Sequence, residues 1–104
     1  MAYQLTVLYH HPEDVEAFDR YYDETHTPLA VKLPDLRSLT VCRPDSDPNG
    51  NRPPYHLIAT LTWDSQEAFQ AALESSKGQE TVADLANFAG AGVDMATGTS
   101  RQIA

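Results

Sequence analysis

The chain has few basic residues and a single cysteine. Its 104 residues include 7 Lys and Arg against 15 Asp and Glu, which gives a formal net charge of −8. A domain this acidic repels phosphate backbones and anionic lipid surfaces, so we expect neither a nucleic-acid nor a membrane partner. Cys42 is alone, which excludes an intramolecular disulfide and a zinc site built from cysteines.

Long apolar runs are also missing. No stretch approaches the ~18 apolar residues of a membrane-spanning helix. The N-terminal segment MAYQLTVLYHHPED lacks the basic region and apolar run of a secretory signal. Hydrophobic residues make up 41% and charged residues 21% of the chain, as in ordinary globular proteins. We therefore expect one cytoplasmic domain spanning residues 1–104.

Apolar periodicity predicts the element order β-α-β-β-α-β. Strands are expected over residues 4–10, 36–42, 55–63 and 93–99, and residues 44–54, rich in Pro, Asn and Gly, should form a mobile loop. This order is typical of a ferredoxin-like α+β fold with an antiparallel sheet and helices on one face. The other face, with Leu8 and Ile58, would then be partly apolar and uncovered in a monomer.

The first helix carries the most informative segment, FDRYYDETHTPLAVKLPDL. It should begin at Pro12 and end near Thr27, because Pro28 disfavours helical geometry at the residue before it. Its predicted buried stripe contains Val15, Phe18, Tyr22, His26 and Leu29.

The later helices have their own start and stop signals. The second should open with a capping box formed by Asp64 and Glu67. A further short helix should follow Gly78 and stop at Gly90.

Tyr22 and His26 are the candidate catalytic residues, because they lie one turn apart on the predicted buried face. Two interpretations of His26 stay open. It is either a core histidine bonded to a backbone carbonyl near the helix C-terminus, or a general acid or base in a pocket, with Tyr22 as its hydrogen-bonding neighbour.

Tyr55 and His56 are candidate ligand-binding residues, since they open the third strand beside the loop. We expect His10 and His11 to cap the first helix or face solvent. The acidic residues of that helix, such as Asp19, should form a solvated face. No metal-ligand spacing is present, so we predict no metal site.

Seven residues carry a resemblance to a known family: Tyr21, Tyr22, His26, Pro28, Leu29, Pro34 and Leu36. In type and order they resemble the EthD family, named for ethyl tert-butyl ether degradation. The resemblance implies a homodimeric α+β barrel that takes a small apolar or aromatic ligand without a cofactor. It also implies a role in small-molecule catabolism or secondary metabolism, as an isomerase, cyclase, decarboxylase or monooxygenase-like enzyme. The alternative is a non-catalytic ligand-binding or accessory protein of an oxidative pathway. A haem ligated by His26 is a third interpretation.

Overall fold

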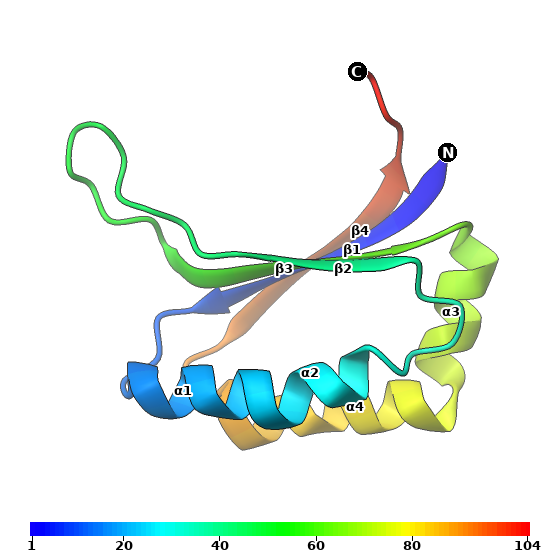
Figure 1. The fold of residues 1–104 in the computed structure, drawn as a ribbon, viewed down its shortest axis with the longest axis horizontal. Helices are drawn as coiled ribbons and strands as arrows, with labels where there is room; N and C mark the ends of the chain where they lie inside the picture. The colour runs from blue at the N-terminus through cyan, green and yellow to red at the C-terminus, as the bar shows by residue number, and fades with distance from the viewer.

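The computed structural model describes residues 1–104 as a four-stranded antiparallel sheet with helices packed on one face (Figure 1). The strands lie in the order β2-β3-β1-β4. Along the chain the elements are β1 (Ala2–His10), α1 (Val15–Tyr21), the π-helical turn η1 (Tyr22–His26), α2 (Thr27–Ala30), β2 (Ser38–Cys42), β3 (Tyr55–Trp63), α3 (Gln66–Glu74), α4 (Ser76–Phe88) and β4 (Val93–Ser100). The predicted ferredoxin-like α+β fold is confirmed. None of the helices is long and apolar enough to cross a membrane.

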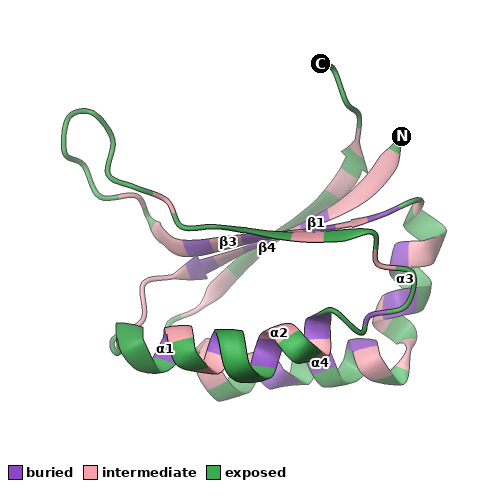
Figure 2. Ribbon diagram, viewed as in Figure 1, coloured by how far each residue is buried: buried purple, intermediate pink, exposed green.

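The core lies between the sheet and the helices (Figure 2). Alternate residues of β1, from Leu5 to Tyr9, are buried, and the antiparallel register sets each of them opposite a buried residue of β3. Leu57 and Trp63 have no exposed surface. Because full burial of a large apolar side chain contributes roughly 1.5–3 kcal/mol, this face of the sheet supplies most of the stability.

The opposite face of the sheet has no helix over it. Thr6 of β1 lies between Thr60 of β3 and Ala96 of β4, and Leu8 lies opposite Ile58. The prediction that Leu8 and Ile58 share the face without helices is therefore confirmed. This face thus carries small polar side chains around one apolar pair, and a second sheet could cover it.

The first helical segment runs past Pro28, so the predicted end near Thr27 is wrong. The π-helical turn η1 intervenes, and the backbone N–H of Thr27 donates to the carbonyl of Tyr22, five residues earlier. Pro28 therefore lies in the first turn of α2, which follows the π turn without a break in helical backbone. Tyr22 and His26, at the two ends of the π turn, are both buried, as predicted.

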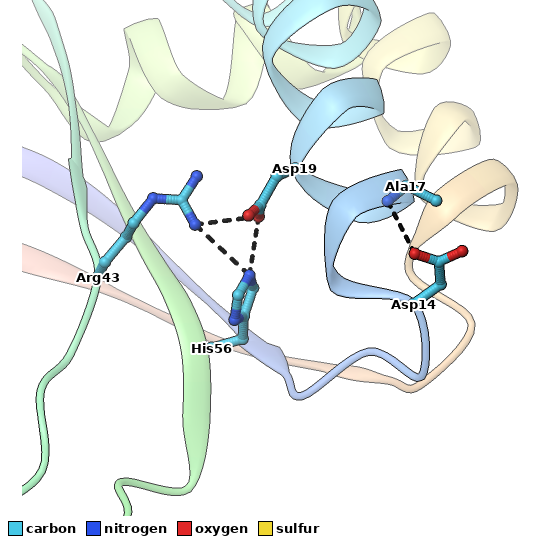
Figure 3. A network of polar contacts seen from close by, with 5 residues as sticks. All are labelled: Asp14, Ala17, Asp19, Arg43 and His56. Carbon is cyan, nitrogen blue, oxygen red and sulfur yellow. Dashed lines mark hydrogen bonds and ion pairs between the residues drawn. The ribbon is translucent and has the colours of Figure 1, made fainter.

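The start of α1 also differs from the prediction. Asp14 is the N-cap, and its carboxylate accepts the backbone N–H of Ala17 at 3.0 Å (Figure 3). Pro12 thus lies before the helix. Val15 is 43% exposed and is not part of the buried stripe.

Two further helix signals were assigned to the wrong residues. Ser65, not Asp64, caps α3 with its side chain, while the Asp64 carboxylate accepts from Arg37 at 2.7 Å. Gly78 lies within α4 and does not precede it, because Ser75 caps that helix.

The segment of residues 44–54 has no helix or strand and projects beyond the sheet (Figure 1). Its turn is organised by Asp47, whose carboxylate accepts the backbone N–H groups of Asn49 and Asn51 at 2.9 Å each. The loop is held at its end, where Nε2 of His11 lies 2.8 Å from the carbonyl oxygen of Pro53. Its mobility stays a prediction.

Candidate active site

A small apolar cavity lies between the helices and the sheet and is bordered by both candidate catalytic residues. Its volume is about 50 Å³, and 13 of its 15 lining residues are hydrophobic. Leu5 and Leu61 form part of the sheet wall, and Tyr22 and His26 form part of the helical wall. Ligand pockets usually span about 300–1,000 Å³, so the cavity in this form admits only a few heavy atoms.

His26 is buried and bonded to a carboxylate. Its side chain is 6% exposed, and Nδ1 lies 2.9 Å from Oδ2 of Asp84, whose side chain is 8% exposed. Asp84 comes from α4, which packs against η1. An ionised carboxylate only accepts hydrogen bonds, so Nδ1 of His26 carries a proton and donates it to Asp84.

The other oxygen of Asp84 accepts two hydrogen bonds of its own. The hydroxyl of Tyr21 donates to Oδ1 at 2.6 Å, and the side-chain amide of Asn87 donates to the same atom at 2.9 Å. Burial alone would raise the pKa of Asp84, but hydrogen bonds from Tyr21, Asn87 and His26 outweigh it and lower that pKa. Asp84 is therefore an anion at neutral pH.

The ring of Tyr22 contacts the ring of His26, but the two side chains do not form a hydrogen bond. The two ring centroids are 5.6 Å apart, and the polar partner of His26 is Asp84. The predicted hydrogen bond between Tyr22 and His26 is therefore wrong, because the two rings lie side by side at a tilt of 38° and α4 supplies the acceptor for Nδ1 of His26. Burial, with the nearby charge of Asp23, raises the pKa of Tyr22 to about 12. At neutral pH the Tyr22 hydroxyl is protonated and can donate a hydrogen bond but cannot act as a base.

Tyr9 was not among the candidate residues, although it also lines this cavity. It is 2% exposed, and burial, Tyr22 and Asp84 all raise its pKa. Its ring contacts Tyr22 edge-on at 5.6 Å. The cavity therefore has two protonated phenols beside one imidazole.

Tyr55 and His56 lie in two other clusters and do not join His26. Nε2 of His56 lies 2.8 Å from Oδ1 of Asp19, which also accepts from Arg43 at 3.0 Å (Figure 3). Asp19 is therefore paired and only 32% exposed, whereas Asp23 and Glu24, the other acidic residues of the predicted solvated face, are exposed as expected. Burial would raise its pKa, but the hydrogen bonds from His56 and Arg43 lower it.

The third cluster is exposed. Oδ2 of Asp94 accepts from the hydroxyl of Tyr55 at 3.0 Å, and Nε2 of His10 lies at the same distance from the same oxygen. His10 and His11 do not cap the first helix, because Asp14 does so and His11 contacts the loop instead. Each of His10, His26 and His56 therefore has its own aspartate.

Aromatic rings separate the His56 cluster from the cavity. His56 packs edge-on against Phe18 at 5.2 Å, and Phe18 stacks on Tyr22 at 6.1 Å. Neither Tyr55 nor His56 lines the cavity, so a ligand-binding role for them there remains a prediction without geometric support. No group of three or more His, Cys, Asp or Glu side chains is arranged to hold a metal ion.

An open groove of about 560 Å³ lies between the start of α1 and the end of α4. Its lining includes Phe18, Tyr21, Asn87 and Phe88, and the rings of Tyr21 and Phe88 stack at 5.3 Å. Both side chains that hold Oδ1 of Asp84 thus border this groove, while His26 borders the cavity.

The sequence contains a signal for Asp84 that was not used. Thr81, Asp84, Leu85 and Phe88 follow helical spacing i, i+3, i+4, i+7. An aspartate within such a stripe is buried only when it is paired. This would have marked Asp84 as the partner of a buried group, without saying which one.

The chain is similar to proteins of one family over most of its length. Residues 10–92 match the model of the EthD domain. An uncharacterised 11.0 kDa protein from the thcB–thcC intergenic region of Rhodococcus erythropolis is 38% identical over 93 residues, which is 89% of each protein.

Solved structures extend the comparison. The crystal structure of an EthD family protein from Bacillus halodurans has a TM-score of 0.90 and 34% identity, covering 97% of this chain and 100% of the other. A variant of SnoaB, a cofactor-independent oxygenase from Streptomyces nogalater, has a TM-score of 0.65 at 17% identity and covers 97% and 93%. The second likeness shows the fold alone.

Proposed function

The chain belongs to the EthD family, and we propose that it is a cofactor-independent enzyme of small-molecule catabolism or secondary metabolism that transfers a proton by means of His26. One observation carries the proposal: His26 borders an apolar cavity and donates from Nδ1 to the buried carboxylate of Asp84 at 2.9 Å. In the neutral imidazole this pairing puts the proton on Nδ1, so Nε2 is the nitrogen that can accept a proton. The pairing also stabilises the imidazolium that forms when Nε2 accepts one.

The chemistry that suits this cavity is abstraction of a proton from an acidic carbon or a phenol. The proton moves to Nε2 of His26, and the electron pair stays on the substrate as an enolate or phenolate. The hydroxyls of Tyr9 and Tyr22 remain protonated at neutral pH and can donate to the developing oxyanion. The proton then returns from His26 to another atom of the substrate, which makes the step an isomerisation or a part of a cyclisation or decarboxylation.

A second candidate function is a non-catalytic ligand-binding or accessory role. The cavity volume of about 50 Å³ favours the accessory role, because a substrate or a bound ligand of metabolic size requires the helices to move away from the sheet.

A homodimer forms part of the proposal. The uncovered sheet face carries Leu8 and Ile58 and lies away from the cavity. We propose that two such faces pack together into a barrel, since an apolar pair on a flat sheet is stabilised by removal from water.

The experiment uses nitroethane, a small carbon acid that loses its proton slowly in neutral buffer. Exchange of its methylene protons in D₂O is followed by NMR, with wild-type protein and with His26→Gln. We expect the protein to accelerate exchange and His26→Gln to fold normally but lose the acceleration by about 10²–10⁴-fold, the usual contribution of a positioned base.

His10→Gln is the matched control, because His10 also pairs with an aspartate but is exposed. It should keep the full rate. A rate equal to that of buffer for wild type would favour the accessory role, and full activity of His26→Gln would make His26 structural.

A further inference from the structure

We propose that Tyr21 and Asn87 are positioning residues for His26: by holding one oxygen of Asp84 they aim the other at Nδ1 and so make Nε2 the reactive nitrogen. The inference rests on the proposed function only where it calls Nε2 reactive. The placement of the proton stands on hydrogen-bond geometry alone.

The two carboxylate oxygens of Asp84 have different hydrogen-bond partners. Both Tyr21 and Asn87 donate to Oδ1, whereas His26 lies on Oδ2. Phenol and amide N–H groups are donors toward a carboxylate, so Oδ1 must be an acceptor. Tyr21 and Asn87, which border the groove, therefore fix the rotation of the Asp84 carboxylate about its side-chain bond.

The Asp84→Asn substitution tests this positioning. It keeps the shape of the side chain but replaces one of the two equivalent oxygens by an amide nitrogen. In Asp84→Asn, the donors Tyr21 and Asn87 should hold the amide oxygen at the Oδ1 position. The amide nitrogen then faces Nδ1 of His26 and donates to it. Nδ1 can accept only without its own proton, so the proton should move to Nε2.

The exposed cluster provides a matched control with the same residue types and a different geometry. There, Tyr55 and His10 both lie on Oδ2 of Asp94, each at 3.0 Å. In Asp94→Asn the oxygen held by Tyr55 is therefore the one that faces His10. The protonation of the His10 ring should not invert.

The test is ¹⁵N NMR of the histidine rings at a pH where each ring is neutral, because protonated and bare ring nitrogens have well-separated shifts. We expect Nδ1–H with bare Nε2 for His26 in wild type, and the reverse in Asp84→Asn. Removing both donors in that background, with Tyr21→Phe and Asn87→Ala, frees the amide to rotate and should restore the Nδ1–H signal.

Three results would overturn the inference. They are Nε2–H in the wild-type protein, unchanged Nδ1–H in Asp84→Asn, and an inverted ring that persists after both donors are removed. The wild-type spectrum alone decides the first of these results, and the two Asp84→Asn spectra decide the role of Tyr21 and Asn87.

Nitroethane exchange separates this inference from the proposed function. If the His26 proton moves to Nε2 in Asp84→Asn but the wild-type protein does not accelerate exchange, the proposed function is wrong and the positioning role is supported. If the wild-type protein accelerates exchange but the His26 proton stays on Nδ1 in Asp84→Asn, the positioning role is wrong and the proposed function is supported.

Discussion

Gly78→Ala is the substitution for which local helix preference and the tertiary structure predict opposite effects. Gly78 lies within α4 and has ordinary helical backbone. In an exposed helix, replacing Gly by Ala stabilises by about 1 kcal/mol. A prediction from propensity alone is therefore a more stable protein.

The packing of α3 against α4 reverses the sign of the expected stability change, so that Gly78→Ala should destabilise the protein. A Cβ atom at position 78 would lie 2.5 Å from the carbonyl oxygen of Leu73 and 2.7 Å from its carbonyl carbon, and closer still to the carbonyl oxygen of Ala72. Both obstacles are backbone, so they cannot rotate away. Overpacking costs about 1–3 kcal/mol where side chains can adjust.

We take the upper end of that range, about 3 kcal/mol, and subtract the propensity gain of about 1 kcal/mol. Gly78→Ala should then destabilise the protein by about 2 kcal/mol. For a domain of this size the melting temperature falls by roughly 4–8 °C per kcal/mol, so a drop of roughly 8–16 °C is expected. The strain is relieved by moving α3 and α4 apart, and α4 carries Asp84, so exchange activity should fall as well.

Urea unfolding followed by the fluorescence of Trp63, the only tryptophan and fully buried, measures the change. Gly90→Ala is the control, because a Cβ there meets nothing within 4 Å. An unchanged or higher free energy of unfolding for Gly78→Ala would refute the close approach of the two helices.

Three further predictions concern acid, the loop and assembly. The lowered pKa values of Asp84 and Asp19 mean that the unfolded chain binds more protons, so stability should decline as the pH falls from about 4 through the lowered folded values. Between pH 7 and 2.5, the urea midpoint should fall less steeply for Asp84→Asn than for the wild type. If the midpoints of both proteins fall equally with pH, the lowered pKa of Asp84 is contradicted. Replacing residues 45–52 with a short Gly-containing turn should change stability by less than about 1 kcal/mol, because the contact of Pro53 with His11 is kept; a collapse of the melting curve would show that the loop packs elsewhere. Light scattering should give about twice the chain mass of 11.5 kDa, and a monodisperse monomer would contradict the barrel.

Local pattern was enough to predict most of the fold. The third strand was placed at the bounds observed, Tyr55–Trp63, because a nearly continuous run of apolar and β-branched residues is typical of a strand. His26 and Tyr22 were predicted to be buried because they recur at helical spacing with Phe18. Helix boundaries were less accurate, since caps depend on which side chain happens to reach the backbone. Ser65 reaches it where Asp64, drawn to Arg37, does not.

The sequence by itself determined the order of elements, the buried face of each and a histidine on one of those faces. Only the tertiary structure decided the partner of that histidine, since Asp84 is 58 positions away and three histidines each have an aspartate. Which pair is buried depends on how α4 packs against the π turn of the first helical segment. Periodicity determines which face of a helix is buried, whereas a hydrogen bond between two helices requires their relative position to within a few tenths of an ångström.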